Sequence, residues 1–183
     1  GKLDELIGQL MDLTRLDDPK IEMGQETFDL TDLLDHVVAA AEIEAGAKGV
    51  AIDWSKPEPL PVEADAALLG SAIENVLRNA IRFSPGGGTV TVRLAPPETD
   101  AAGQMARIRI ADHGPGVPDS ELEAIFDPFH QVDRARSPDR GGKGLGLAIA
   151  AGVIRRHGGK IEASNREDGG LQVRILIPAR AGD

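Results

Sequence analysis

Residues 71–84, SAIENVLRNAIRFS, predict a helix with one apolar and one polar face, and the fold follows from how such a helix must pack. At about 100° per residue, the apolar side chains gather on the side that we expect to face a sheet. Asparagine is a poor helix former, so two asparagines four residues apart favour a function over a solvated outer face, which stays the alternative. Amide oxygens can bind Mg²⁺, and arginine suits phosphate. The polar face holds Asn75, Arg78, Asn79 and Arg82, and the apolar face holds Leu69, Ile73, Val76 and Ala80.

On either side of this helix, segments with helical and with alternating patterns follow one another. Two hairpins are expected, one around the turn-rich residues 96–103 and one around 166–170. Helices interleaved with paired strands predict an α/β fold, a two-layer sandwich with a mixed, mostly antiparallel sheet packed on helices. The predicted strands are 26–30, 50–55, 62–65, 89–95, 105–112, 159–165 and 171–179, and the predicted helices are 31–48, 65–83, 120–125 and 144–156.

A further amphipathic helix is predicted at residues 3–16, where apolar residues recur at spacings of three and four. Its apolar stripe is narrow and close to a heptad seam, which favours packing on a partner helix. The alternative is an ordinary first helix that docks on its own domain. The stripe consists of Leu3, Leu6, Ile7, Leu10, Leu13 and Leu16, and Pro19 ends the helix.

The composition limits the class of protein. The chain has 183 residues, enough for one domain with a short appendage. It has no cysteine, which excludes disulfides and cysteine nucleophiles. Its net charge of −10 argues against nucleic acid as a partner. No stretch approaches the roughly 18 consecutive apolar residues of a membrane span, and the first residues, GKLDELIGQL, do not form a signal peptide pattern.

A second candidate element is the turn ADHGPGVP, residues 111–118. Asp112 is expected at the end of a strand, and Gly114 and Gly116 let the backbone come close to a ligand. A carboxylate in such a place suits the amino edge of adenine, through a charge-assisted hydrogen bond of about 1.5–3 kcal/mol. The alternative is a tight turn in which Asp112 bonds its own backbone.

The third candidate element is the glycine-rich stretch GGKGLGLAIA, residues 141–150, which opens onto a predicted helix. Such loops often hold phosphate, because their N–H groups lie at the positive end of the helix dipole. The stretch matches neither G-x-x-x-x-G-K-[ST] nor G-x-G-x-x-G, so another architecture is expected. The segment before it, about 127–143, is long and irregular. We interpret it as a lid, with Phe126 and Phe129 as anchors, rather than as a disordered surface loop.

Taken in order, these segments resemble the ATP-binding catalytic domain of sensor histidine kinases, in the Bergerat superfamily that also includes gyrase and MutL. ENVLRNAIRFS resembles the N box of that family, DHGPGV its first glycine box, FDPFHQVD its F box, GGKGLGLAIA its second glycine box and GGLQVRILIP its closing segment. Five boxes in order over roughly residues 27–178 make the resemblance specific. It implies the Bergerat fold, with residues 1–20 as the end of a dimerisation helix and its linker, 21–183 as the catalytic domain and about 127–143 as its ATP lid. The N box and the brief lid are most similar to envelope-stress sensors of Gram-negative bacteria.

The resemblance also implies an ATP site with Mg²⁺. Asn79 would bind the Mg²⁺, assisted by Asn75. Arg78 and Arg82 would reach the phosphates, and Asp112 would hold the adenine amino group. The other implied nucleotide contacts are Gly114, Gly116, Val117, Phe129, Arg140, Gly142, Lys143, Gly144, Leu145, Gly146 and Leu147.

Several residues depart from the pattern of the family. Arg82 stands where lysine is usual, and Phe83 replaces a frequent tyrosine. Lys143 replaces a small threonine or serine between the glycines, so it adds a phosphate contact or moves the lid. His113 stands where asparagine or aspartate is common.

The implied activity is transfer of the γ-phosphate of ATP to a histidine on a dimerisation helix, and from there to an aspartate of a response-regulator receiver domain. The four histidines, His36, His113, His130 and His157, all lack the setting of that phosphoacceptor. We therefore expect the acceptor and a sensor upstream, in a parent protein that forms a homodimer. The chain would then be the cytoplasmic portion of an inner-membrane sensor.

An ATPase, or an ATP-binding regulatory module that transfers nothing, stays open as the alternative. The ATPases of the superfamily place a glutamate one helical turn before the magnesium asparagine. Here that position is Asn75, and Glu74 is about 100° away around the helix. This offset favours phosphoryl transfer over hydrolysis.

Overall fold

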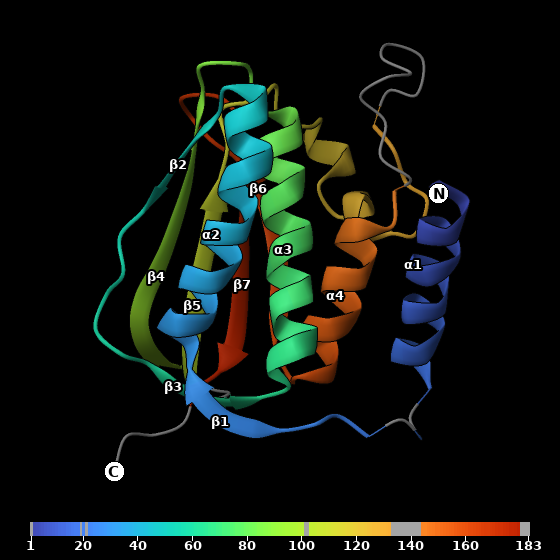
Figure 1. Cartoon of the computed structure of the whole chain (residues 1–183), viewed down its shortest axis with the longest axis vertical. Coiled ribbons are helices and arrows are strands. Elements are labelled where there is room, and N and C mark those ends of the chain that lie inside the picture. The colour runs from blue at the N-terminus through green and yellow to red at the C-terminus, as the bar shows by residue number, and fades with distance from the viewer. Residues whose placement is uncertain (1, 19, 21, 101–102, 133–143, 180–183) are drawn as a thin grey trace.

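The computed structural model describes residues 2–18, 20, 22–100, 103–132 and 144–179, which fold into an α/β sandwich (Figure 1). Within these residues the main sheet has five strands in the order β2-β4-β5-β7-β6. β2 and β4 are parallel, and the other neighbouring pairs are antiparallel, which confirms the mixed, mostly antiparallel sheet. A small antiparallel sheet joins β1 and β3. The strands are β1 Glu26–Asp29, β2 Ala51–Trp54, β3 Pro61–Ala64, β4 Thr89–Asp100, β5 Gly103–Ala111, β6 Lys160–Asn165 and β7 Leu171–Pro178.

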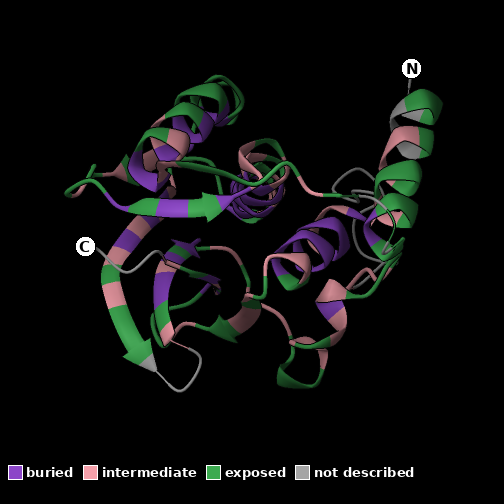
Figure 2. Ribbon diagram, turned by 90° about the horizontal axis from the view of Figure 1, so that it is seen from below, coloured by how far each residue is buried: buried purple, intermediate pink, exposed green. Residues whose placement is uncertain are grey.

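The helices α2, α3 and α4 cover one face of the main sheet (Figure 1), and the buried residues lie between the two layers (Figure 2). The apolar face of α3 is buried as predicted, and each large side chain there contributes about 1.5–3 kcal/mol by leaving water. None of the described helices is long and apolar enough to cross a membrane. The helices are α1 Lys2–Asp17, α2 Leu30–Lys48, α3 Ala66–Phe83 and α4 Gly146–Arg156.

Two aspartates determine where α2 and α3 begin. Asp29 Oδ1 accepts a hydrogen bond from the N–H of Thr31 at 2.9 Å, and Asp65 Oδ1 accepts one from the N–H of Leu68 at 2.9 Å. Such an N-cap contributes about 1 kcal/mol, because it satisfies a backbone donor that the helix itself leaves unpaired. The start of α4 has no such side-chain cap.

The structure corrects the sequence prediction at two places. β4 continues to Asp100 through residues that we expected in a turn, and its pairing with β5 shifts register between Ala95 and Glu98. The two prolines, which cannot donate to a ladder, fall in this irregularity. The helix predicted at 120–125 is instead two 3₁₀ turns, Asp119–Glu121 and Ala124–Phe126, neither of which has a side-chain cap. So short a segment does not offset the cost of starting an α-helix.

Helix α1 docks on its own domain at one end and exposes apolar residues at the other. Leu16 is buried beside α4, and Leu13 packs against the core. Towards the N-terminus the helix stands clear of the sandwich and its surface is largely exposed (Figure 2). The docking of Leu13 and Leu16 agrees with the alternative of a first helix on its own domain, and the partner helix stays a prediction. The exposed apolar residues are Leu3, Ile7, Leu10 and Met11.

His157, at the end of α4, ties this helix to the start of α3. Its Nε2 accepts a hydrogen bond from the N–H of Asp65 at 3.0 Å, while its Nδ1 lies 2.8 Å from the carbonyl oxygen of Val153. This pair of contacts requires the neutral ring with its hydrogen on Nδ1.

Replacing His157 with leucine is expected to lower the free energy of unfolding by about 1–3 kcal/mol, because the N–H of Asp65 loses its acceptor. Urea denaturation followed by circular dichroism measures the change. His36→Leu is the matched control, since His36 is exposed on α2, and it should change stability by less than about 0.5 kcal/mol. Equal losses in both variants would contradict the role of His157.

Candidate functional site

The described residues among those predicted for the site lie towards one end of the strands of the main sheet, where β5 ends, α4 begins and the C-terminal half of α3 lies (Figure 1). Asp112 directly follows β5, and Gly146 is the first residue of α4. The side chain of Asn75 faces that first turn, since a Cβ on Gly146 would lie 3.3 Å from Asn75 Oδ1. A Cβ on Gly114 would lie 2.6 Å from the carbonyl oxygen of Phe83, at the end of α3. Three segments that are remote in sequence therefore form one site.

The structure brings Asn79 and Arg82 together and holds Arg78 apart. Arg82 Nη2 donates to Asn79 Oδ1 at 3.3 Å, and both residues are half-buried. Arg78 is exposed and forms ion pairs with Glu44 of α2 at 3.3 Å and with Glu74 at 2.6 Å. Exposed ion pairs of this kind contribute at most about 1 kcal/mol, so they hold Arg78 only weakly.

Two buried polar atoms at the end of α3, Arg82 Nε and Ser84 Oγ, have no hydrogen-bond partner among the described residues. Burial lowers the pKa of the Arg82 guanidinium, whose carbon lies 4.9 Å from the centre of the Phe83 ring. An unsatisfied buried polar atom costs about 1–3 kcal/mol, so both atoms fit a site at which a polar ligand supplies the partners. The sequence patterns pointed to Arg82 and missed Ser84, because a lone serine at a helix end is common in any fold.

Asp112 is a buried carboxylate, and one of its oxygens accepts hydrogen bonds from the protein backbone. Its side chain is 3% exposed, and Oδ1 accepts hydrogen bonds from the N–H groups of Gly114 at 2.8 Å and Leu171 at 3.1 Å. Among the described residues no hydrogen bond goes to Oδ2. Burial raises the pKa of this carboxyl, and the two N–H groups and the nearby charges of Arg166 and His113 oppose that rise. Asp112 can therefore bond the backbone of its own turn through Oδ1 and a ligand through Oδ2, so the two interpretations are compatible.

The loop after Asp112 is tightly fitted to its surroundings. Besides the close approach of Gly114 to Phe83, Gly116 has φ +69° and lies against the side chain of Asn165. Val117 is half-buried and packs against the core. The described structure therefore fixes the shape of this loop without a ligand.

The start of α4 offers backbone N–H groups to the site. Leu145, which precedes the helix, is fully buried, and Leu147 packs partly on the core. The side chain of Leu145 is therefore out of reach of a ligand, and that of Leu147 is only partly accessible. Because none of the side chains that the structure describes caps α4, its first-turn N–H groups can bind an anion at the positive end of the helix dipole.

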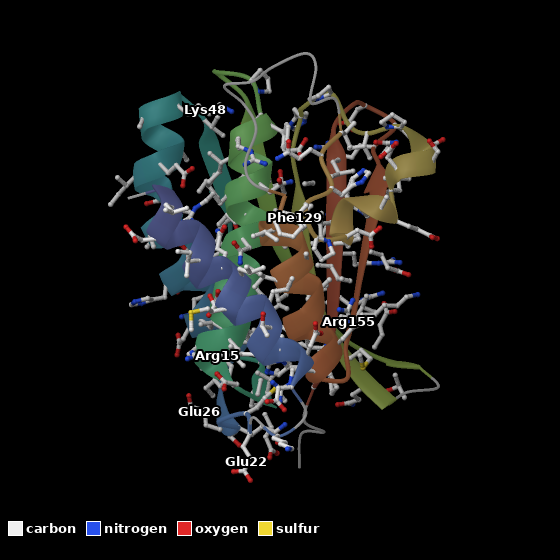
Figure 3. The ribbon with its side chains drawn as sticks, turned by 90° about the vertical axis from the view of Figure 1, so that its right-hand side faces the viewer. Arg15, Glu22, Glu26, Lys48, Phe129 and Arg155 are labelled. Atoms are coloured by element: carbon white, nitrogen blue, oxygen red, sulfur yellow. The ribbon has the colours of Figure 1, made fainter. Side chains whose placement is uncertain are left out.

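Phe129 lies beside the start of α4 (Figure 3), and its N–H donates to the carbonyl oxygen of Gly144 at 2.8 Å. This bond joins the two ends of the segment that we interpreted as a lid. Phe126 packs against the core, as expected of an anchor, whereas Phe129 is 49% exposed and has a left-handed φ of +63°. Most of the lid lies outside the described residues, including the predicted contacts Arg140, Gly142 and Lys143.

A polar cavity of about 280 Å³ adjoins Asn75 on the side of α1. Asn75 therefore borders both the start of α4 and the space between α1 and α3. The cavity is lined by Gly8, Gln9, Asp12, Ser71, Glu74, Asn75, Arg78 and Ile149.

Residues 64–181 match the family described as histidine kinase-, DNA gyrase B- and HSP90-like ATPase. The matched range exceeds half of the chain and contains all of the predicted site residues. Among solved structures, the mycobacterial sensor histidine kinase MprB is 30% identical with a TM-score of 0.70, over 85% of this chain and 98% of that one. Full-length ShkA, solved in complex with AMPPNP, is 26% identical with a TM-score of 0.83, over 98% of this chain and 36% of that one.

Curated relatives match almost the entire chain. The sensor histidine kinase CpxA of Escherichia coli is 35% identical over 179 residues, which are 97% of this chain and 37% of CpxA. The non-motile and phage-resistance protein of Caulobacter vibrioides is 31% identical over 178 residues, which are 97% of this chain and 21% of that protein. The chain thus spans between 21% and 37% of the length of these two relatives.

Proposed function

Because this chain belongs to the family of histidine kinase-, DNA gyrase B- and HSP90-like ATPases, we propose that it is the ATP-binding catalytic domain of a two-component sensor histidine kinase. One observation supports the ATP site: Asp112 follows the end of β5, and the C-terminal half of α3, with Asn79, and the start of α4 lie towards that same end of the strand (Figure 1). A buried carboxylate suits the amino group of adenine, and an amide oxygen suits a divalent cation. The N–H groups at a helix start suit a triphosphate. The presence of AMPPNP in ShkA supports the same kind of ligand here.

Each end of the nucleotide has its own set of residues in this proposal. Asp112 Oδ2 accepts a hydrogen bond from the adenine amino group, and Gly114, Gly116 and Val117 shape the pocket around the ring. Arg82, whose Nε has no hydrogen-bond partner among the described residues, donates to phosphate oxygens. The N–H groups of Gly144, Leu145, Gly146 and Leu147, with Phe129, Arg140, Gly142 and Lys143 of the lid, complete the phosphate site.

The amide oxygens of Asn79 and Asn75 are hard, neutral ligands that suit Mg²⁺ when phosphate oxygens supply most of the coordination. Bound Mg²⁺ neutralises part of the charge on the triphosphate. In the structure Asn79 Oδ1 accepts a hydrogen bond from Arg82 Nη2 at 3.3 Å, so in this proposal that oxygen binds Mg²⁺ once the guanidinium has turned to the phosphates.

The reaction is transfer to a histidine that lies on another segment. A nitrogen of that imidazole forms a bond to the γ-phosphorus as the bond to the β–γ bridging oxygen breaks, ADP leaves, and a base on the acceptor segment takes the proton. This chain orients the triphosphate and neutralises its charge. Glu74 lies on the exposed side of α3, where it pairs with Arg78, about 100° around the helix from Asn75, and we take this offset to favour transfer over hydrolysis.

The remaining parts of the proposal concern the parent protein. Residues 1–20 are the end of a dimerisation helix with its linker, residues 21–183 are the catalytic domain, and about 127–143 form the ATP lid. The exposed apolar residues of α1 support a partner helix in the dimerisation domain of a homodimer. The phosphoryl group passes on to a response-regulator receiver domain. The chain is a cytoplasmic portion of an inner-membrane sensor, the arrangement that we infer from kinship with sensor kinases such as CpxA.

Phosphotransfer can be tested with γ-labelled ATP and a separately produced phosphoacceptor segment of the parent protein. The unaltered chain should place label on a histidine of that segment. Asn79→Ala should weaken Mg²⁺-dependent ATP binding about tenfold or more and abolish labelling. Gln104→Ala is the control, since it removes an exposed amide at the other end of β5, and it should behave like the unaltered chain.

Three outcomes separate the possible functions. Label on the histidine supports the kinase. Rapid release of labelled phosphate by the chain alone would favour an ATPase, and ATP binding with no transfer or release would favour a regulatory module.

A further inference from the structure

The turn between β6 and β7, residues 166–170, packs against the loop that carries Asp112. The sequence of this turn, REDGG, predicts only a reversal of the chain. In the structure, Arg166 of this turn and Asn165 just before it contact the loop of residues 112–119 at both of its ends. These contacts are made by side chains, which a chain reversal does not need. We call Asn165 and Arg166 the clamp residues.

Arg166 holds the first end of the loop. Its Nη1 donates to the carbonyl oxygen of Asp112 at 2.9 Å, and its Nη2 donates to Asp168 Oδ2 at 2.6 Å. From the other side, the N–H of Asp112 donates to the carbonyl oxygen of Leu171 at 2.9 Å. The side chain of Arg166 is only 20% exposed, so its bond to Asp112 is partly shielded from water, whereas Asp168 is 64% exposed. The backbone of Asp112 is therefore fixed at both its N–H and its carbonyl group.

Asn165 holds the second end of the loop. Its Oδ1 accepts a hydrogen bond from the N–H of Val117 at 3.0 Å, and its Nδ2 donates to the carbonyl oxygen of Val117 at 2.6 Å. The same Nδ2 donates to Asp119 Oδ1 at 2.8 Å. The side-chain amide thus pairs with Val117 as a neighbouring strand would. A Cβ on Gly116 would lie 2.6 Å from Asn165 Oδ1, so this pairing leaves space only for glycine.

Arg166 also acts on the charge of Asp112. Burial raises the pKa of the Asp112 carboxyl; the N–H groups of Leu171 and Gly114 oppose that rise, and so do the Arg166 guanidinium and the neighbouring His113. Asp168 is paired with Arg166, and its Oδ2 lies 4.0 Å from His113 Nε2. Loss of the guanidinium would therefore release the backbone of Asp112 and also favour protonation of the oxygen that must accept a hydrogen bond.

We propose that Arg166 and Asn165 are positioning residues for adenine recognition, which hold the carboxylate of Asp112 and the glycine loop in the geometry that discriminates the adenine amino group. The inference rests on the proposed function, because it presupposes that Asp112 contacts adenine. It predicts a specific defect. Loss of a clamp residue should reduce the preference for a purine that carries the amino group. It should not lower the affinity for all nucleotides by the same factor.

The test compares ATP with purine riboside triphosphate, which lacks the 6-amino group, by isothermal titration calorimetry with Mg²⁺. A hydrogen bond to a charged acceptor corresponds to a preference of roughly 10- to 100-fold, so the unaltered chain should bind ATP more tightly by about that factor. Arg166→Met keeps the aliphatic stem and should reduce the preference to about threefold or less. Arg166→Lys, which keeps the charge, should recover part of it, and Asn165→Ser should reduce it severalfold.

Arg174→Met is the matched control. Arg174 lies on the same hairpin and forms an ion pair with Glu162 at 2.6 Å, the same length as the pair between Arg166 and Asp168, but it does not touch the loop. This variant should keep the preference of the unaltered chain. Thermal melts of all variants establish that each is folded at the temperature of the titration.

The outcomes separate this inference from the function on which it rests. A full preference for ATP in folded Arg166→Lys, Arg166→Met and Asn165→Ser would overturn the positioning role alone. An equal loss of affinity for both nucleotides would also overturn the positioning role, because a turn with a merely structural role affects both nucleotides alike. Equal affinity of the unaltered chain for the two nucleotides would overturn the assignment of Asp112 to adenine, and the inference with it.

Discussion

Replacing Asp112 with asparagine is expected to lower the affinity for ATP roughly 10- to 100-fold while leaving the fold intact or making it more stable. The affinity falls because an amide directed at the adenine amino group loses the charge-assisted hydrogen bond and can present its own N–H groups to it. The fold survives because an amide oxygen can still accept from the N–H groups of Gly114 and Leu171, as Oδ1 does now. Isothermal titration calorimetry and urea denaturation measure the two effects separately.

The stability of the Asp112→Asn variant follows from the sign of the pKa shift. Burial raises the pKa of Asp112 above its ordinary value of 3.8, so the folded state binds the proton more tightly than the unfolded state does. The contribution of this group to stability is therefore present at low pH and is lost as the pH rises from the ordinary value through the raised one. The variant lacks this titration. The free energy of unfolding of Asp112→Asn, relative to that of the unaltered chain, should therefore increase as the pH rises from the ordinary to the raised pKa of Asp112. The difference should persist at neutral pH.

The affinity for ATP should change with pH in the opposite direction. Only the ionised carboxylate of Asp112 makes the full charge-assisted bond, so lowering the pH through its raised pKa should weaken ATP binding. Asp53→Asn is the control, because Asp53 pairs with Arg93 on the exposed side of β2 and lies outside the site. It should leave both affinity and stability nearly unchanged. A loss of stability in Asp112→Asn that matches its loss of affinity would contradict this account.

The helices and their faces could be predicted from the sequence because their determinants are local. The apolar face of α3 repeats every three to four residues, and Asp65 stands immediately before the first turn that it caps. The same locality explains why Asn75, Asn79 and Arg82 could be placed on one side of a helix. The meeting of that side with Gly146 then follows from the packing of α3 on α4.

The contacts that complete the site could not be predicted in this way, because they join distant segments through single side chains. Asn165 bonds Val117 across 48 positions, and Arg166 bonds Asp112 across 54. Arg78 is held by Glu44, 34 positions away, although its place on the helix allowed a phosphate contact. A hydrogen bond between a side chain and a remote backbone group produces neither a periodic pattern nor a recognisable motif in the sequence. The register of β7 between β5 and β6 brings Asn165 and Arg166 to the loop of Asp112, and the packing of α2 on α3 brings Glu44 to Arg78.

Gly170→Ala is expected to lower the free energy of unfolding by about 2–6 kcal/mol, because it separates the β6–β7 turn from the loop of Asp112. A Cβ on Gly170 would lie 2.0 Å from the carbonyl oxygen of Asp112 and 2.9 Å from the Cα of His113. Both neighbours are backbone, so neither can turn away, and such overpacking costs about 1–3 kcal/mol. The φ of +102° adds strain of about 1–3 kcal/mol for any residue with a side chain.

Gly169→Ala separates the steric cost of Gly170→Ala from the conformational one. Gly169 also has a positive φ, +89°, but nothing lies within 4 Å of the Cβ that it would carry. Its replacement should therefore cost only the backbone strain, about 1–2 kcal/mol, and leave ATP binding unchanged. Gly170→Ala should in addition weaken ATP binding about tenfold in conditions where it stays folded, since the displaced carbonyl belongs to Asp112. If urea denaturation gave the same loss of unfolding free energy for both variants, the turn would accommodate the added methyl group at Gly170. The close contact between the hairpin and the loop of Asp112 would then not contribute to stability.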